Sequence, residues 1–146
     1  MATIKDVLKN KGGGIYSISP DQTVYEAIQL LSEKKIGALL VIDQNRPVGI
    51  ISERDYARKV ILAGRSSKST RVKEIMTGKV ICIDTGSSME EAMAIMTNKK
   101  IRHLPVMENN KCVGMISLGD LVKHQVDQQK FMIDQLVKYI SNEYMA

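Results

Sequence analysis

Residues 34–55 read KKIGALLVIDQNRPVGIISERD, and residues 99–120 read KKIRHLPVMENNKCVGMISLGD. The two stretches align without a gap at an offset of 65 residues, and the alignment extends over residues 15–56 and 80–121. A gapless repeat over this length predicts one supersecondary unit that is used twice in the fold.

The strands of this unit are indicated by short β-rich runs. In the first copy these runs are residues 15–18, 38–42 and 48–51. The last two are separated by residues 43–47, Asp-Gln-Asn-Arg-Pro, whose composition is typical of a turn. The pattern therefore predicts a short strand followed later by a β-hairpin, and the second copy repeats it.

The helices are indicated by capping signals. Thr23-x-x-Glu26 and Ser88-x-x-Glu91 have the spacing of a capping box, so a helix is expected to begin directly after each Thr or Ser. A second helix is expected after the serine near the end of each quoted stretch. Each copy thus reads as β-α-β-β-α.

One such unit has too little core to fold alone, so we expect the two copies to pack as a single pseudo-symmetric α/β (α+β) module. We assign residues 1–71 to the first repeat with its N-terminal segment and linker, 72–124 to the second repeat, and 125–146 to a C-terminal helical extension. The polar stretch 64–71 is the expected hinge, and the glycine-rich stretch 11–14 predicts a loose first connection.

The C-terminal residues keep helical spacing of apolar side chains, which predicts one long amphipathic helix. Because this helix is longer than the repeat requires, we expect it to support a two-fold homodimer. Its apolar positions are Leu121, Val122, Val126, Met132, Ile133, Leu136, Val137, Ile140 and Tyr144.

Composition restricts the partners only loosely. The net charge of +5 favours an anionic partner, whereas an aromatic content of 4% without tryptophan leaves few platforms for stacking bases. No signal peptide or apolar run of about 20 residues is present, so a cytoplasmic location is predicted. Cys82 and Cys112 match no metal or disulfide spacing, and the two histidines have no clustered ligands, so no metal is predicted.

The sharpest local signal is the repeated block Gly-apolar-apolar-Ser-x-x-Asp, at residues 49–55 and 114–120. It ends a strand and begins a helix, where free backbone amides attract phosphate, glycine allows close approach and a carboxylate can accept ribose hydroxyls. The alternative is that Ser-x-x-Asp is only a helix cap, which is the commoner use of this pattern. Duplication of the whole block favours the binding interpretation.

Together these motifs resemble the CBS family, whose paired domains form the Bateman module. The resemblance covers almost the whole chain and rests on residues 17–24 (SISPDQTV) with Glu26-Ala27, on residues 101–106 (IRHLPV), and on both Gly-to-Asp blocks. It implies a non-catalytic sensor that binds an adenine nucleotide, such as AMP, ADP, ATP or NAD, in the cleft between repeats and transmits the signal to a partner chain.

The resemblance also nominates binding residues by matching position. In the family, adenine packs between the first two strands, Ser or Thr and Asp of the block contact ribose and phosphate, and basic residues of the partner repeat neutralise the phosphates. For one site this gives Ser17, Ala38, Leu39, Ser52, Arg54 and Asp55, and for the other Cys82, His103, Leu104, Ser117 and Asp120.

The two sites are not expected to be equal. Arg102-His103 of the second repeat stands where the first has Gly37-Ala38, and Cys82 replaces the usual Ser or Thr. If phosphate ligands come from the opposite repeat, Arg102 and His103 join Arg54 at the Asp55 site. The sequence therefore ranks the Ser52/Asp55 site first.

The sequence leaves two other functions open. An RNA- or DNA-binding module is supported by the net charge and the basic stretch 65–79, but is weakened by the scarcity of aromatic side chains. A small hydrolase or transferase acting on nucleotides has no motif behind it, since the sequence contains no nucleophile elbow, Walker loop or HExxH.

Overall fold

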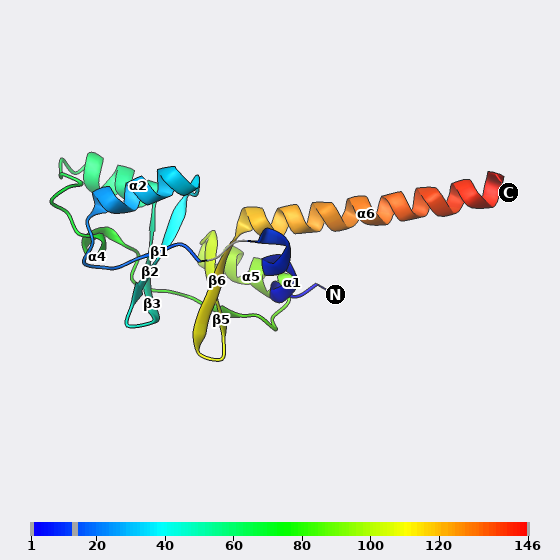
Figure 1. Cartoon of the computed structure of the whole chain (residues 1–146), viewed down its shortest axis with the longest axis horizontal. Coiled ribbons are helices and arrows are strands. Elements are labelled where there is room, and N and C mark those ends of the chain that lie inside the picture. The colour runs from blue at the N-terminus through cyan, green and yellow to red at the C-terminus, as the bar shows by residue number, and fades with distance from the viewer. Residues whose placement is uncertain (1, 13–14, 146) are drawn as a thin grey trace.

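A computed structural model of the chain describes residues 2–12 and 15–145, with the backbone alone for residues 142–145. Two similar α/β halves lie side by side, and one long helix projects from the second half (Figure 1). The elements in chain order are α1 (Ile4–Lys11), β1 (Ser17–Ile18), α2 (Val24–Lys34), β2 (Ala38–Asp43), β3 (Arg46–Ser52), α3 (Glu53–Tyr56), a π-helical turn (Ala57–Ile61), α4 (Val72–Ile75), β4 (Ile83–Asp84), α5 (Met89–Lys99), β5 (His103–Glu108), β6 (Lys111–Ser117) and α6 (Leu118–Met145).

Each half contains one three-stranded sheet, and the two sheets have the same topology. β1 pairs in parallel with β2, which pairs antiparallel with β3, and β4, β5 and β6 repeat this order. Even the irregularity recurs, because the register shifts between Val41 and Ile42 in one sheet and between Val106 and Met107 in the other. The predicted mixed α/β architecture with two repeats is confirmed.

The hairpins are tighter than the sequence suggested. Asp43 and Arg46 are paired strand residues, so the expected five-residue turn contracts to Gln44-Asn45, with φ of 50° and 64°. Asn109-Asn110 of the second repeat has φ of 51° and 64°. Two successive positive φ values are those of a type I′ turn, whose twist matches that of the flanking strands.

The capping signals mark the helix starts as predicted. Thr23 caps α2 and exchanges hydrogen bonds with Glu26, and the Ser88 hydroxyl accepts from the Glu91 amide at the start of α5. The repeated lysine pairs lie at the opposite ends of these helices. The second lysine of each pair, Lys35 or Lys100, takes the left-handed conformation that ends the helix.

The hydrophobic cores do not follow the division of the sequence at residue 71. Ile4 and Val7 of α1 are buried in the core of the second repeat, whereas Val72 and Ile75 of α4 are buried in the core of the first. Backbone hydrogen bonds fix both helices in these positions. The Ile4 amide donates to the Ser87 carbonyl oxygen at 2.9 Å, and the Val72 amide donates to the Gln22 carbonyl oxygen at 2.8 Å. The two spatial halves therefore exchange their leading helices, which ties them into one module.

The closing helices also differ. The first repeat ends in the four-residue α3 and a π-helical turn, whereas the second runs into the 28-residue α6 without a break near residue 124. The long helix was predicted, but the proposed extension 125–146 continues the closing helix of the second repeat. Gly13 and Gly14, part of the expected loose connection, and the side chain of Tyr144 lie outside the described residues. No described helix is long and apolar enough to cross a membrane.

Candidate functional site

A cavity of about 730 Å³ lies where the two halves meet. The first half contributes the approach to β2, and the second contributes β5, β6 and the start of α6, while α1 lies along one side. Its lining residues include Lys5, Lys9, Lys11, Ile15, Tyr16, Ile36, Gly37, Ala38, His103, Gly114, Met115, Ser117 and Asp120. The cavity therefore contains one copy of the repeated Ser-x-x-Asp motif together with residues of the opposite repeat.

Ser117 and Asp120 form a helix cap at the wall of this cavity. The Ser117 amide donates to Oδ2 of Asp120 at 2.8 Å, and the Asp120 amide donates to the Ser117 hydroxyl at 3.0 Å. Burial alone would raise the pKa of Asp120, but the hydrogen bonds from Lys11 and Ser117 and the charge of Lys11 outweigh it and hold the pKa below 3.8. Asp120 is thus a carboxylate at neutral pH.

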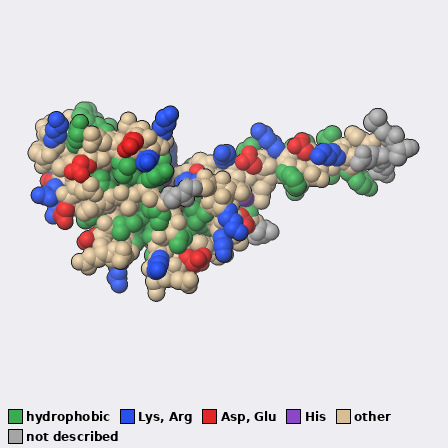
Figure 2. Space-filling model, viewed as in Figure 1, with side chains coloured by type: hydrophobic (Ala, Val, Ile, Leu, Met, Phe, Trp, Pro, Cys, Tyr) green, Lys and Arg blue, Asp and Glu red, His purple; other side chains and the backbone are tan. Residues whose placement is uncertain are grey.

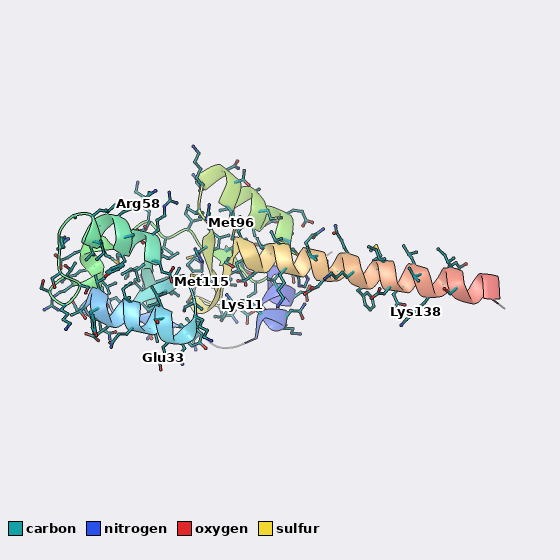
Figure 3. All side chains as sticks on the ribbon, turned by 90° about the horizontal axis from the view of Figure 1, so that it is seen from above. Lys11, Glu33, Arg58, Met96, Met115 and Lys138 are labelled. Carbon is teal, nitrogen blue, oxygen red and sulfur yellow. The ribbon has the colours of Figure 1, made fainter. Side chains whose placement is uncertain are left out.

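Lys11 is the closest cation to this carboxylate among the described residues. Its Nζ lies 2.8 Å from Oδ2 of Asp120 and donates to the carbonyl oxygen of Met115 at 2.7 Å. Figure 3 labels Lys11 and Met115 at the junction of the two halves. Lys11 therefore connects the end of α1 to both β6 and the first turn of α6.

His103 faces the same cavity from the start of β5. Burial lowers the pKa of His103, and the positive charges of Lys11 and Arg102 lower it further, although Asp120 opposes them. His103 is accordingly neutral near pH 7 and offers a hydrogen bond rather than a positive charge.

The Ser52/Asp55 motif has the same cap but different surroundings. The Ser52 amide and hydroxyl both lie 3.0 Å from Oδ2 of Asp55, and Lys59 lies 3.4 Å from Oδ1. The neighbouring edge of β3 is covered by the chain after α4, because Ile50 and Thr77 exchange backbone hydrogen bonds of 3.1 and 2.9 Å. Met115, the counterpart of Ile50, instead faces Lys11 and the cavity.

Comparison with known proteins matches this architecture to one family. The family model of the CBS domain matches residues 4–61 and 72–127. The chain belongs to the CBS domain family. CBS domain pairs are typically regulatory and bind nucleotides.

Relatives of this CBS pair come from distant organisms. It is 40% identical to the mitochondrial CBS domain-containing protein CBSX3 of Arabidopsis thaliana, over 97% of this chain and 73% of that protein. A solved protein with CBS domains from Burkholderia ambifaria is 50% identical with a TM-score of 0.82, over 88% of this chain and 96% of the other. A CBS domain protein from Pyrobaculum aerophilum shares the fold, with a TM-score of 0.73 at 22% identity, over 82% of this chain and 89% of the other.

Of the residues nominated from the sequence, the CBS cavity gathers four: Ala38, His103, Ser117 and Asp120. The side chains of Leu39 and Leu104 are completely buried in the two cores, where they pack, and their role as ligand contacts stays a prediction. Both point inward because alternate residues of a strand face opposite sides of its sheet.

The other nominated residues lie outside the lining of this cavity. Ser17, Arg54 and Arg102 are exposed, and Ser52 and Asp55 are partly buried beside the covered edge of β3. Cys82 is also partly buried; burial and, to a lesser extent, the nearby Cys112 raise the pKa of its thiol. A raised pKa makes Cys82 a weak nucleophile.

Sequence reasoning missed the contribution of α1. Lys5, Lys9 and Lys11 reach the cavity because α1 packs against the second half, and Tyr16 adds an aromatic ring. The available signal was the cluster of lysines within residues 5–11, but the internal repeat gave no reason to place it beside Asp120. No group of acidic, cysteine or histidine side chains in the described part of the chain is arranged to hold a metal ion.

Proposed function

We propose that this CBS pair is a regulatory protein that binds an adenine nucleotide, such as AMP, ADP, ATP or NAD, in the 730 Å³ cavity at Ser117 and Asp120. The observation that carries the proposal is the convergence of one Ser-x-x-Asp cap, residues of the opposite repeat and the lysines of α1 on a single cavity. Its volume lies within the range of about 300–1,000 Å³ typical of small-molecule sites.

The ribose is assigned to Asp120. The hydrogen bond from the Ser117 amide and the ion pair with Lys11 both fall on Oδ2, and Oδ1 is the oxygen assigned to accept a ribose hydroxyl. The adenine would lie near Gly37 and Ala38 of the first repeat, where small side chains leave room beside Tyr16.

The phosphates are assigned to α1. Lys5, Lys9 and Lys11 bring three positive charges to one side of the cavity, against the carboxylates of Asp120 and Glu108. The Pyrobaculum aerophilum protein was solved in complex with AMP, which supports the capacity of this fold to hold such a ligand.

Regulation would follow from the position of the cavity between the halves. A nucleotide touching Ala38 on one side and Asp120 on the other binds better when the halves adopt one particular separation. It therefore favours that arrangement over others, and a partner chain that distinguishes the arrangements responds to the ligand.

Isothermal titration calorimetry with AMP and NAD tests the site. Asp120→Ala is expected to abolish most of the binding, whereas Asp55→Ala, the same change at the matching position of the first repeat, is expected to retain it. The sequence ranked the two sites in the opposite order. Loss of binding in Asp55→Ala alone would restore that ranking and reject the cavity as the principal site.

The same titrations separate the other functions left open by the sequence. A nucleic-acid module would bind RNA or DNA with an affinity that falls steeply with salt and would bind free AMP weakly. A nucleotide hydrolase or transferase would convert the bound ligand, which mass spectrometry of the mixture detects. Saturable AMP binding without turnover supports the regulatory proposal.

A further inference from the structure

The second part of α6 extends beyond the body of the molecule and is exposed along its length. Leu121 and His124 are the last buried side chains that the structure describes, and every side chain in residues 125–141 is exposed. Figure 1 shows this segment projecting away from both halves. Because most helical stability in proteins comes from packing of an apolar face, this length of helix needs a partner along its side.

The exposed segment carries a heptad pattern. Apolar side chains recur at alternating steps of four and three residues, with a single polar residue, Gln129, in the series. In heptad notation the a positions are Val126, Ile133 and Ile140, and the d positions are Val122, Gln129 and Leu136.

These positions are strongly exposed in the single chain. Ile133, Leu136 and Ile140 are 58%, 56% and 52% exposed, and Met132 and Tyr139, at the flanking g positions, are 64% and 66% exposed. Figure 2 shows hydrophobic side chains on the surface along α6. An exposed apolar stripe of this kind on a protruding helix marks an interface.

We infer that two copies of the chain pair through α6 as a parallel, in-register coiled coil over residues 122–140. β-Branched residues at a with leucine at d favour parallel two-stranded coils, and here Ile133 and Ile140 alternate with Leu136. In this register each Gln129 meets Gln129 of the other copy, and an amide can donate to and accept from its counterpart.

Charge along the helix does not oppose pairing with a second copy. A parallel coil sets each g position beside the e position five residues later in the partner, which pairs Gln125 with Lys130 and Met132 with Val137. No like charges oppose each other in either pair.

The charged residues of the helix argue against a membrane surface. Asp127 and Asp134 are interspersed with Lys130 and Lys138, so this helix lacks the excess of cations typical of interfacial helices. The CBS domain match ends at residue 127, so most of the coil lies beyond the nucleotide-binding fold. The inference is independent of nucleotide binding.

Cysteine crosslinking tests the orientation. In the full chain with Cys82→Ser and Cys112→Ser, Leu136→Cys is expected to form a disulfide-linked dimer on mild oxidation, since equivalent d positions adjoin only in a parallel, in-register pair. Gln135→Cys, on the outer face, is the matched control and is expected to stay uncrosslinked. No crosslink at Leu136→Cys, or equal crosslinking in both variants, overturns the arrangement.

Light scattering of the full chain at micromolar concentration tests the association itself. The unmodified protein and the Gln135→Asp variant are expected to have the mass of at least two chains. The Leu136→Asp variant is expected to dissociate to half of that mass, because pairing would bury its carboxylate in the seam. A monomeric unmodified chain, or a Leu136→Asp variant of unchanged mass, overturns the inference. Because residues 125–141 lie outside both cores, neither substitution disturbs the folded body.

Discussion

Replacing Gly49 by alanine tests why the edge of β3 is covered whereas the matching edge of β6 borders the cavity. A Cβ added at Gly49 would lie 2.5 Å from Sδ of Met76 and 2.9 Å from the carbonyl oxygen of Thr77. The methionine can move, but the carbonyl is held by its hydrogen bond from Ile50. The substitution must therefore displace the backbone segment that covers the edge of β3.

The cost follows from the balance of two effects. Overpacking of this kind costs about 1–3 kcal/mol, while exchanging glycine for alanine in a strand recovers about 0.5–1 kcal/mol of backbone entropy. Gly49→Ala should thus destabilise the protein by about 1 kcal/mol, within a range of roughly 0–2.5 kcal/mol. For a chain of this size, a loss of 1 kcal/mol lowers the melting temperature by about 2–4 °C.

Gly114, the matching position of the second repeat, supplies the control. A Cβ there would lie 2.9 Å from Cδ2 of Leu8, the mobile end of a side chain, and no backbone atom is among its nearest contacts. Gly114→Ala should therefore change stability by less than about 0.5 kcal/mol, because the entropy gain offsets a small adjustment. Urea denaturation of both variants measures the loss in the free energy of unfolding. Equal losses would refute the claim that residues 76–77 cover the edge of β3 while the matching edge of β6 stays open.

Three further predictions concern charge. Lys11→Met should weaken AMP binding about tenfold or more, since a charge-assisted contact is worth about 1.5–3 kcal/mol. Adenosine, which has no phosphate, should keep nearly its full affinity. Calorimetry with both ligands measures this, and an equal loss of affinity for both would assign Lys11 a purely structural role. The depressed pKa of Asp120 contributes stability that is present above pH 3.8 and is lost as pH falls through the folded-state pKa, so the deficit of Asp120→Asn in urea denaturation should shrink between pH 5 and pH 3. Arg102→Ala should keep AMP affinity within about twofold, because an exposed side chain in water contributes little; a tenfold loss of AMP but not of adenosine would instead support the cross-repeat phosphate site that the sequence suggested.

The repeated unit and its local chemistry follow from the order of residues along the chain. The offset of 65 residues, the capping residues Thr23 and Ser88, and the β-rich runs fixed the order and type of elements, because caps and strand patterns depend on residues close together in the chain. The repeated Ser-x-x-Asp blocks were likewise recognisable, and both occur as helix caps at strand ends. Four of the nominated residues lie together at the cavity.

Tertiary structure decided which half keeps an open site. The exchange of α1 and α4 brings Lys11 to Asp120 across 109 positions of sequence and brings Thr77 against Ile50, and neither contact has a local signature. The sequence ranked the two Ser-x-x-Asp blocks by the basic residues expected near each of them. In the structure they differ because the exchanged segments cover the edge of β3 at Ile50 but leave Met115 of β6 at the cavity. These contacts depend on α1 and α4 each packing on the core of the other repeat. Burial of apolar faces, rather than proximity in the chain, decides where each helix packs.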